Sequence, residues 1–216
     1  MFYFDTFNGN KVLKSDYLDE ITAFFTTRTY NNIPFADKVD IKKPEQTHGD
    51  NVEFADERET YPHTDGLITD NTNTALCLKF ADCTPLMFYN PVTKAGAVSH
   101  AGWRGTAAKI GVKTVLKMGG NPEDIIAVIG PAIGLCCYEV SDDVKSKLLM
   151  TVKDTDKLSV KNHVDLKAIN ARQLQEIGVK NIDICPYCTS CDNDLFFSYR
   201  KENGTPERHY AIMRLC

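Results

Sequence analysis

Three short apolar segments, joined only by turns, constrain the fold more than any other feature of the sequence. They cover residues 75–80, 86–89 and 95–99 and are rich in the aliphatic and aromatic residues that strands favour. The connection Asn-Pro-Val-Thr-Lys, residues 90–94, is turn-like and short enough for a β-hairpin. Because no helical pattern separates these strands, they do not form a regular βαβ succession, and an α+β fold is predicted.

The remaining chain alternates further strands with three amphipathic helices. A helix is predicted over residues 106–118 and stops at Gly119. Ser141 is predicted to cap a helix that ends near residue 150, and Asp165 to cap one over residues 166–177. A loop is expected at residues 30–34. Other strands are predicted at residues 20–27, 52–54, 66–69 and 125–129, near residue 182, and at residues 195–197 and 210–213. No repeat or linker divides the chain, so residues 1–216 are predicted to form a single domain.

The composition, 43% hydrophobic and 25% charged, is typical of a soluble globular protein. A net charge of −4 without a basic run argues against nucleic-acid binding. The first residues do not have the pattern of a secretory signal, and no stretch approaches the roughly 20 apolar residues that a membrane span requires. The eight cysteines are therefore expected to stay reduced, and a cytoplasmic location is expected. These features are compatible with a monomer, and the sequence alone does not define the oligomeric state.

One thiol and two imidazoles lie near predicted strand ends or turns and could bind a metal ion. They are Cys83, His100 at the end of an apolar run, and His48 in the turn Gln-Thr-His-Gly. Three protein ligands and an open position are typical of catalytic zinc, and two histidines with one cysteine are an accepted set. A single cysteine, however, is commonly a buried small hydrophobe, and no local motif ties the three together. Spacing alone leaves both interpretations open, with His63, His163 and His209 as competing imidazoles.

A second thiol group is Cys185-Pro186-Tyr187-Cys188-Thr189-Ser190-Cys191. A C-x-x-C spacing suggests thiol redox chemistry, but a thioredoxin-like fold has this motif near its start. A structural zinc or iron–sulfur site would need a fourth ligand, and the only nearby candidate in the sequence is Cys216. A structural or incidental role is therefore favoured.

Arg28 and Arg104 are the cations that we expect at a functional site. The planar guanidinium fork binds phosphate or carboxylate bidentately. Arg104 stands at a predicted helix start, where the helix dipole adds positive potential. A surface salt bridge is the alternative for either residue.

Six motifs occur together, in an order that resembles the bacterial YfiH-like family, also called the laccase-domain or polyphenol oxidase family. The chain reads Gln-Thr-His-Gly at 46–49, Asp-Gly-Leu-Ile-Thr at 65–69, Ala-Asp-Cys-Thr-Pro at 81–85, His-Ala-Gly-Trp-Arg-Gly-Thr at 100–106, Ile-Gly-Pro-Ala-Ile-Gly at 129–134 with Cys-Tyr-Glu-Val at 137–140, and Leu-Phe-Phe-Ser-Tyr-Arg at 195–200. The resemblance runs from about residue 26 to residue 216. One departure lies at residues 27–32, where Thr-Arg-Thr-Tyr-Asn-Asn replaces the glycine-containing loop common in the family.

The resemblance implies a four-layer α/β/β/α sandwich like that of cytotoxic necrotizing factor catalytic domains. It also implies a zinc ion held by His48, Cys83 and His100. Family members are described as purine nucleoside phosphorylases that act on adenosine, inosine and methylthioadenosine, with adenosine deaminase activity besides. Purine nucleoside and phosphate are the small-molecule partners that follow, and no nucleic acid or membrane partner is expected.

On this hypothesis Arg28 and Arg104 hold phosphate against the sugar carbon and act in catalysis. Asp82 and Gln46 orient the site, and Gln46 also contacts substrate. A copper-dependent phenol oxidase is an alternative, with Cu²⁺ at the same ligands and Met87 as axial ligand. Five histidines are too few for a multicopper site. A metal-independent cysteine hydrolase or amidase, including one that edits peptidoglycan precursors, is the other alternative, with Cys83 as nucleophile and His100 as base.

Overall fold

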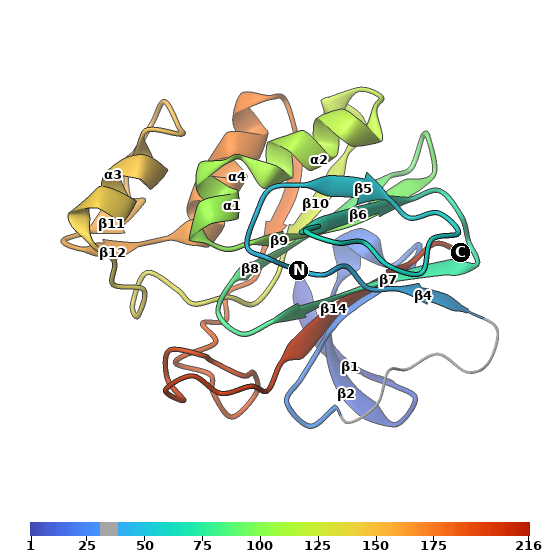
Figure 1. Cartoon of the computed structure of the whole chain (residues 1–216), viewed down its shortest axis with the longest axis horizontal. Helices are drawn as coiled ribbons and strands as arrows, with labels where there is room; N and C mark the ends of the chain where they lie inside the picture. The colour runs from blue at the N-terminus through green and yellow to red at the C-terminus, as the bar shows by residue number, and fades with distance from the viewer. Residues whose placement is uncertain (31–38) are drawn as a thin grey trace.

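The computed structural model describes residues 1–30 and 39–216, which form two stacked six-stranded sheets (Figure 1). The first sheet has the order β1-β2-β3-β14-β7-β4, so β14 lies between strands from the beginning and the middle of the chain. Its strands are β1 Phe2–Phe7, β2 Asn10–Ser15, β3 Thr22–Thr26, β14 His209–Arg214, β7 Thr74–Phe80 and β4 Asp40–Lys42.

The second sheet has the order β13-β10-β8-β9-β6-β5. At its centre, β8 and β9 form the predicted antiparallel hairpin, in which Pro85 pairs with His100. Its strands are β13 Asn181–Ile184, β10 Ile126–Ile129, β8 Thr84–Asn90, β9 Ala95–Ala101, β6 Gly66–Thr69 and β5 Val52–Phe54. A separate two-stranded ribbon pairs β11 Ser159–Val160 with β12 His163–Val164.

Apolar side chains from both sheets form a shared core between them, which includes Phe25, Leu78, Met87 and Val98. Helices α1, α2 and α4 lie over the outer face of the second sheet, while α3 lies beside them near the ribbon (Figure 1). The helices are α1 Trp103–Ala107, α2 Ile110–Met118, α3 Asp142–Leu149 and α4 Leu166–Glu176, with short 3-10 turns η1 Asp16–Leu18 and η2 Pro122–Asp124. The α+β class and the sandwich of two sheets are confirmed. The described residues place no α-helix on the outer face of the first sheet.

The predicted helix over residues 106–118 is two helices instead of one. Lys109 adopts a left-handed conformation with φ of 59°, which ends α1 and begins α2 in a new direction. The turn sets which side chains face the sheet: Thr114 and Val115 are buried, whereas Leu116 is exposed. Both predicted caps are confirmed, since Ser141 accepts from the backbone of Val144 and Asp165 from that of Ala168.

The strand predicted at residues 195–197 is wrong. The backbone N–H groups of Leu195 and Phe196 both donate to Asp192 O, which closes a turn. The hairpin of β1 and β2 was not predicted, although its Asn8-Gly9 turn has positive φ at both residues, as hairpin turns of this composition do. Of the loop predicted at residues 30–34, all but the first position lies outside the described residues. In the described part of the chain, every helix is too short or too polar to cross a bilayer.

Candidate metal centre and its pocket

Three segments converge where the β8–β9 hairpin meets the end of β7. Cys83 lies in the connection from β7 to β8, and His100 lies in β9 beside it, because Pro85 and His100 are register partners. His48 comes from the turn before β5 and has φ of 62°. The ligand atoms of Cys83, His48 and His100 all lie within 4.8 Å of one another, and the two imidazole centroids are 4.8 Å apart. The structure therefore brings the three predicted ligands together.

The carboxylate of Asp65, fully buried directly before β6, holds two of these ligands in place. Its Oδ1 lies 2.7 Å from His100 Nδ1 and accepts the backbone N–H of His48 at 3.0 Å. Its Oδ2 accepts the N–H groups of Thr47 and Gly49 at 3.1 and 2.7 Å. One carboxylate thus shapes the His48 turn and orients the His100 ring. Sequence reasoning did not assign Asp65 to the site, although the Asp-Gly-Leu-Ile-Thr motif contains it.

The protonation of the cluster reflects its charges as well as its burial. Burial alone would raise the pKa of Cys83, but the charges and hydrogen bonds of His100 and His48 lower it to about 6. Burial would likewise lower the pKa of His100, yet the Cys83 thiolate and the Asp65 carboxylate raise it to about 9. The pKa of Asp65 falls, against the effect of its burial, through its hydrogen bonds to His100 and to backbone N–H groups. In the absence of a metal, the pocket therefore favours a thiolate beside an imidazolium.

The donor set fits a zinc ion with one open coordination position. Thiolate and imidazole are both good zinc ligands, and three of them leave a fourth place for substrate or water. The bond from His100 Nδ1 to Asp65 leaves Nε2 available as the ligand atom, as in carboxylate–histidine–zinc arrangements. Gly102, the N-cap residue of α1, packs directly against the site. A Cβ at this position would lie only 3.0 Å from Cys83 Sγ.

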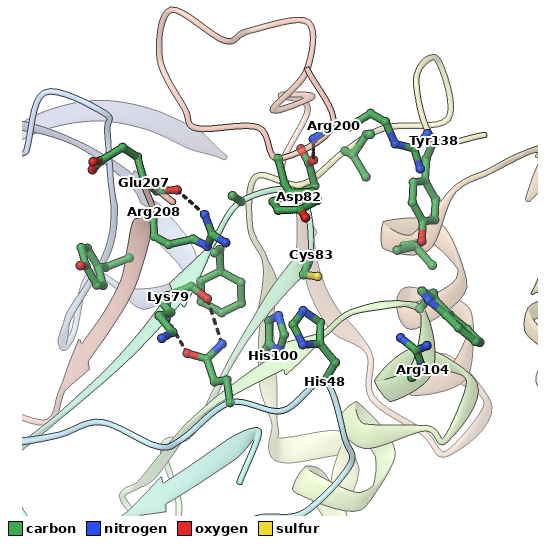
Figure 2. A pocket seen from close by; sticks show the side chains of 18 of the residues that line it. His48, Lys79, Asp82, Cys83, His100, Arg104, Tyr138, Arg200, Glu207 and Arg208 are labelled. Carbon is green, nitrogen blue, oxygen red and sulfur yellow. Dashed lines mark hydrogen bonds between the residues drawn. The ribbon is translucent and has the colours of Figure 1, made fainter. Parts of the chain in front are cut away.

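The cluster lies on the floor of a pocket of about 790 Å³, a size suited to a small organic ligand. Figure 2 shows Arg208 and Lys79 on one side of the two histidines and Arg104 on the other. The pocket is lined by Gln46, His48, Lys79, Phe80, Ala81, Asp82, Cys83, His100, Trp103, Arg104, Ile133, Tyr138, Leu166, Tyr199, Arg200, Pro206, Glu207, Arg208 and Tyr210. Cationic and aromatic side chains therefore surround the candidate metal ligands.

Asp82 and Gln46 both line this pocket, but their polar atoms are already paired with the protein. Asp82 Oδ1 accepts the hydroxyl of Thr189, and its Oδ2 accepts the backbone N–H of Arg200, both at 2.7 Å. The amide of Gln46 donates to Lys79 O and accepts from Lys79 N, both at 2.9 Å. These contacts join pocket segments that are distant in sequence.

The two predicted arginines have different surroundings. Arg104 is exposed and stacks on Trp103, and its side chain makes no hydrogen bond or ion pair with the described residues, so its guanidinium can bind a ligand. Arg28 does not line the pocket. It pairs with Glu202 at 2.7 Å, donates to Asn193 O, and lies over the Phe197 ring. Three cations of the wall, Lys79, Arg200 and Arg208, were not predicted, because their segments meet only in the fold.

The other candidate ligands lie away from the cluster. His63 is exposed, His163 lies in β12, and His209 is fully buried between the rings of Phe80 and Phe196. Met87, a candidate axial ligand for copper, is buried in the core between the sheets and does not line the pocket.

The fold and the site define an α+β protein with a candidate metal centre inside a cationic pocket. The sequence pattern of the family described as multi-copper polyphenol oxidoreductase laccase matches residues 26–216. The chain therefore belongs to this family, which confirms the resemblance seen in its motifs.

Two relatives carry the name purine nucleoside phosphorylase YlmD. The protein from Geobacillus stearothermophilus is 40% identical over 164 residues, which cover 70% of this chain and 60% of the relative. The protein from Bacillus subtilis is 35% identical over 190 residues, covering 78% and 68% of the two chains. The matched segments thus span roughly two thirds or less of these relatives.

Solved structures share the fold over almost the whole chain. Bacillus licheniformis YfiH superposes with a TM-score of 0.88 at 32% identity and 99% coverage of both chains. YlmD from Geobacillus stearothermophilus superposes with a TM-score of 0.87 at 28% identity, covering 100% of this chain and 99% of that one.

Proposed function

We propose that this pocket is the active site of a zinc-dependent purine nucleoside phosphorylase. The observation that carries the proposal is the cluster of His48, Cys83 and His100 in a ligand-sized pocket that is also lined by cationic side chains. The names of the relatives support the same activity. The proposed substrates are adenosine, inosine and methylthioadenosine, with deamination of adenosine as a second reaction.

Phosphorolysis places particular demands on the pocket. An oxygen of phosphate forms a bond to C1′ of the sugar, while the C1′–N9 bond breaks and the purine leaves with its electron pair and takes up a proton. Arg104, whose guanidinium makes no hydrogen bond or ion pair with the described residues, would hold the phosphate, and Lys79 and Arg208 add positive potential around it. Trp103, Tyr138 and Tyr199 offer aromatic faces for a purine ring. A zinc ion at His48, Cys83 and His100 would supply Lewis-acid polarisation of an oxygen atom.

Three of the predicted site residues have positioning roles in this proposal: Asp82, Gln46 and Arg28. Asp82 and Gln46 hold the Cys83 connection and the His48 turn against neighbouring segments. Arg28 pairs with Glu202, whose other carboxylate oxygen accepts the backbone N–H of Ser198 at 3.0 Å. Arg28 thereby fixes the loop that presents Tyr199 and Arg200 to the pocket, so we assign it a positioning role and leave phosphate binding to Arg104.

The test is an assay with each nucleoside in the presence and absence of phosphate. Chromatography should detect free base and sugar 1-phosphate only when phosphate is present, and inosine if adenosine is deaminated. The variant Cys83→Ser should lose both reactions, whereas Cys216→Ser, which changes an exposed thiol elsewhere, should retain them. If no base is released, or if Cys83→Ser releases it at the parent rate, the assignment fails.

A cysteine hydrolase is a second candidate, because Cys83, His100 and Asp65 form a hydrogen-bonded series. Metal analysis of protein purified without added metal separates the two proposals. A metal-free protein that is fully inactivated by alkylation of Cys83 would favour the hydrolase.

The family description raises a third possibility, oxidation of phenols with copper at the same ligands. A multicopper oxidase needs a separate cluster for oxygen reduction, hence many imidazoles. The chain has five histidines, and in residues 1–30 and 39–216 only His48 and His100 share a candidate metal site. Oxygen consumption with a phenol, in copper-loaded protein, would be required to favour this activity.

A further inference from the structure

Four cysteines meet on the side of the fold where the chain leaves β10 and β13. Cys136 and Cys137 lie in a turn closed by the N–H groups of Cys137 and Tyr138, which both donate to Gly134 O. Cys188 and Cys191 lie in a second turn, in which Asp192 N donates to Cys188 O at 2.8 Å. A β-bridge between Ala132 and Cys188 aligns the two turns. The four sulfur atoms all lie within 4.8 Å of one another.

The spacing of the sulfur atoms matches a single tetrahedral metal ion. Cys191 Sγ is 3.5 Å from Cys136 Sγ and 3.4 Å from Cys137 Sγ. Four thiolates around one zinc ion, each at 2.3 Å, would be about 3.8 Å apart. A disulfide requires sulfur atoms at about 2.05 Å, and all eight cysteines are free. An iron–sulfur cluster would hold its cysteine sulfurs farther apart, because several iron and sulfide atoms would lie between them.

The backbone around Cys188 is arranged for a charged sulfur. Gly134 N–H donates to Cys188 Sγ at 3.2 Å, and the N–H groups of Ser190 and Cys191 point to the same atom. Such bonds from the residues after the first cysteine of a C-x-x-C turn stabilise a metal-bound thiolate. Gly134 packs closely against two of the four cysteines, since a Cβ there would lie 3.3 Å from Cys188 Cβ and 3.4 Å from Cys136 Sγ.

The other nearby thiol, Cys185, does not join the group. It is buried in the core between the sheets, and burial raises its pKa to about 12. Its backbone N–H donates to Ile129 O, continuing the pairing of β13 with β10. The two cysteines of the Cys-Pro-Tyr-Cys tetrapeptide therefore do not act together. Cys188 belongs to the same group as Cys191, and Cys185 lies outside it.

We propose that Cys136, Cys137, Cys188 and Cys191 bind one thiophilic metal ion, with zinc as the expected occupant, as a structural site distinct from His48, Cys83 and His100. Cys185 and Cys216, which the sequence suggested as ligands, are not in this group; the adjacent pair Cys136 and Cys137 after β10 takes their two places. Four protein ligands leave no open position, so the site is structural and binds no substrate.

The tetrathiolate site would fix one wall of the pocket. Tyr138, next to Cys137, lines the pocket. Thr189, between Cys188 and Cys191, donates to Asp82, whose second oxygen accepts Arg200 N–H. A metal ion that joins the two turns would therefore hold Tyr138 in place relative to Asp82 and Arg200.

Metal content per chain, measured by mass spectrometry on protein purified without added metal, tests the proposal. Because ligand loss weakens a metal site strongly, Cys191→Ser and Cys188→Ser should each lose about one equivalent of metal. Cys216→Ser, the matched control with an exposed thiol outside the group, should lose none. Cys83→Ser should lose a different equivalent, so that Cys83→Ser/Cys191→Ser loses both. Metal content equal to that of the parent chain in Cys191→Ser and Cys188→Ser would overturn the proposal.

Two measurements on the unmutated chain guard against variants that fail to fold. Titration with a mercurial thiol reagent should release metal to a coloured indicator. Cobalt(II) substitution should give the intense sulfur-to-metal charge-transfer bands of a tetrathiolate site, far stronger than one thiolate can produce. Iron in the same stoichiometry would also support a single-ion site. A native mass lower by two hydrogens per cysteine pair, without bound metal, would show a disulfide and refute the proposal.

Discussion

Asp65 Oδ1 lies 2.7 Å from His100 Nδ1, and the same carboxylate accepts three backbone N–H groups of the turn that carries His48. The two histidines belong to segments far apart in sequence and come together at one acidic side chain. Asp65 is fully buried, and its negative charge is compensated by these donors together with the hydroxyl of Thr47. Metal binding at this centre is therefore expected to depend on Asp65 almost as strongly as on its ligands.

Replacing Asp65 with asparagine should weaken metal binding about 10- to 100-fold, because a neutral amide orients His100 less firmly and its NH₂ group cannot accept the N–H groups of the turn. Competition with a chelating indicator measures the affinity. Asp70→Asn, an exposed aspartate just after β6, is the control and should bind like the parent chain. An unchanged affinity in Asp65→Asn would show that Asp65 does not support the centre.

Gly102→Ala should disturb the centre without straining the backbone. Gly102 has φ of −68°, which alanine adopts freely, but its Cβ would lie 3.0 Å from Cys83 Sγ and 3.4 Å from His48 Cδ2. A metal affinity lower by about tenfold, about 1.4 kcal/mol, is expected, with an unchanged circular dichroism spectrum. Gly49→Ala, whose Cβ would come no closer than 3.4 Å to Asp65, should have a smaller effect. Equal effects of the two substitutions would argue against a steric cause.

Arg104→Ala and Arg28→Ala should differ in what they change. Removal of Arg104 takes a charged donor from the pocket, so the KM for phosphate should rise about 10- to 100-fold, corresponding to about 1.4–2.8 kcal/mol. Removal of Arg28 breaks its pairing with Glu202 and should lower the free energy of unfolding by about 1–3 kcal/mol. Phosphate kinetics and urea unfolding of both variants separate the roles. A phosphate KM that responds only to Arg28 would reverse the assignment.

His209 should make the fold sensitive to acid. Burial, with the charge of Arg208, lowers its pKa to about 3, whereas an unfolded histidine titrates near 6.5. Below pH 6.5 the unfolded chain takes up a proton that the folded chain does not, so the stability contributed by neutral His209 is full above this pH. It is lost as the pH falls toward 3, by up to about 1.4 kcal/mol per pH unit.

Urea unfolding between pH 7 and pH 4 tests this effect against His209→Gln, which cannot titrate. The stability of the variant should fall less steeply with decreasing pH, whatever its absolute value. Parallel pH profiles for the two proteins would rule out His209 as the source.

Local sequence signals predicted much of the second sheet and of the site. The turn at residues 90–94 defined the β8–β9 hairpin, and the hairpin register places His100 beside the Cys83 connection. Helix caps such as Ser141 and Asp165 were also predicted, because capping depends on residues within one helical turn.

Features that depend on distant contacts were not predicted. The left-handed Lys109 interrupts an amphipathic pattern that looks continuous in sequence, and apolar residues 195–197 are buried in part without joining a sheet. Arg208, Arg200 and the four-cysteine group could not be predicted, since their segments are joined only by tertiary structure. Arg28 is the opposite case: the sequence predicted it at the functional site, but in the fold its guanidinium pairs with Glu202 outside the pocket.

The position of β14 in the first sheet has a consequence for how the chain folds during its synthesis. Tyr210 N donates to Thr26 Oγ1 across a separation of 184 residues, and β14 fills the gap between β3 and β7. Until the ribosome has released β14, those two strands have no partner along the facing edges. Pairings over such separations form slowly, since a long loop must be ordered first. The nascent chain therefore exposes two open strand edges during translation, and we expect the first sheet to close only after synthesis of residue 214.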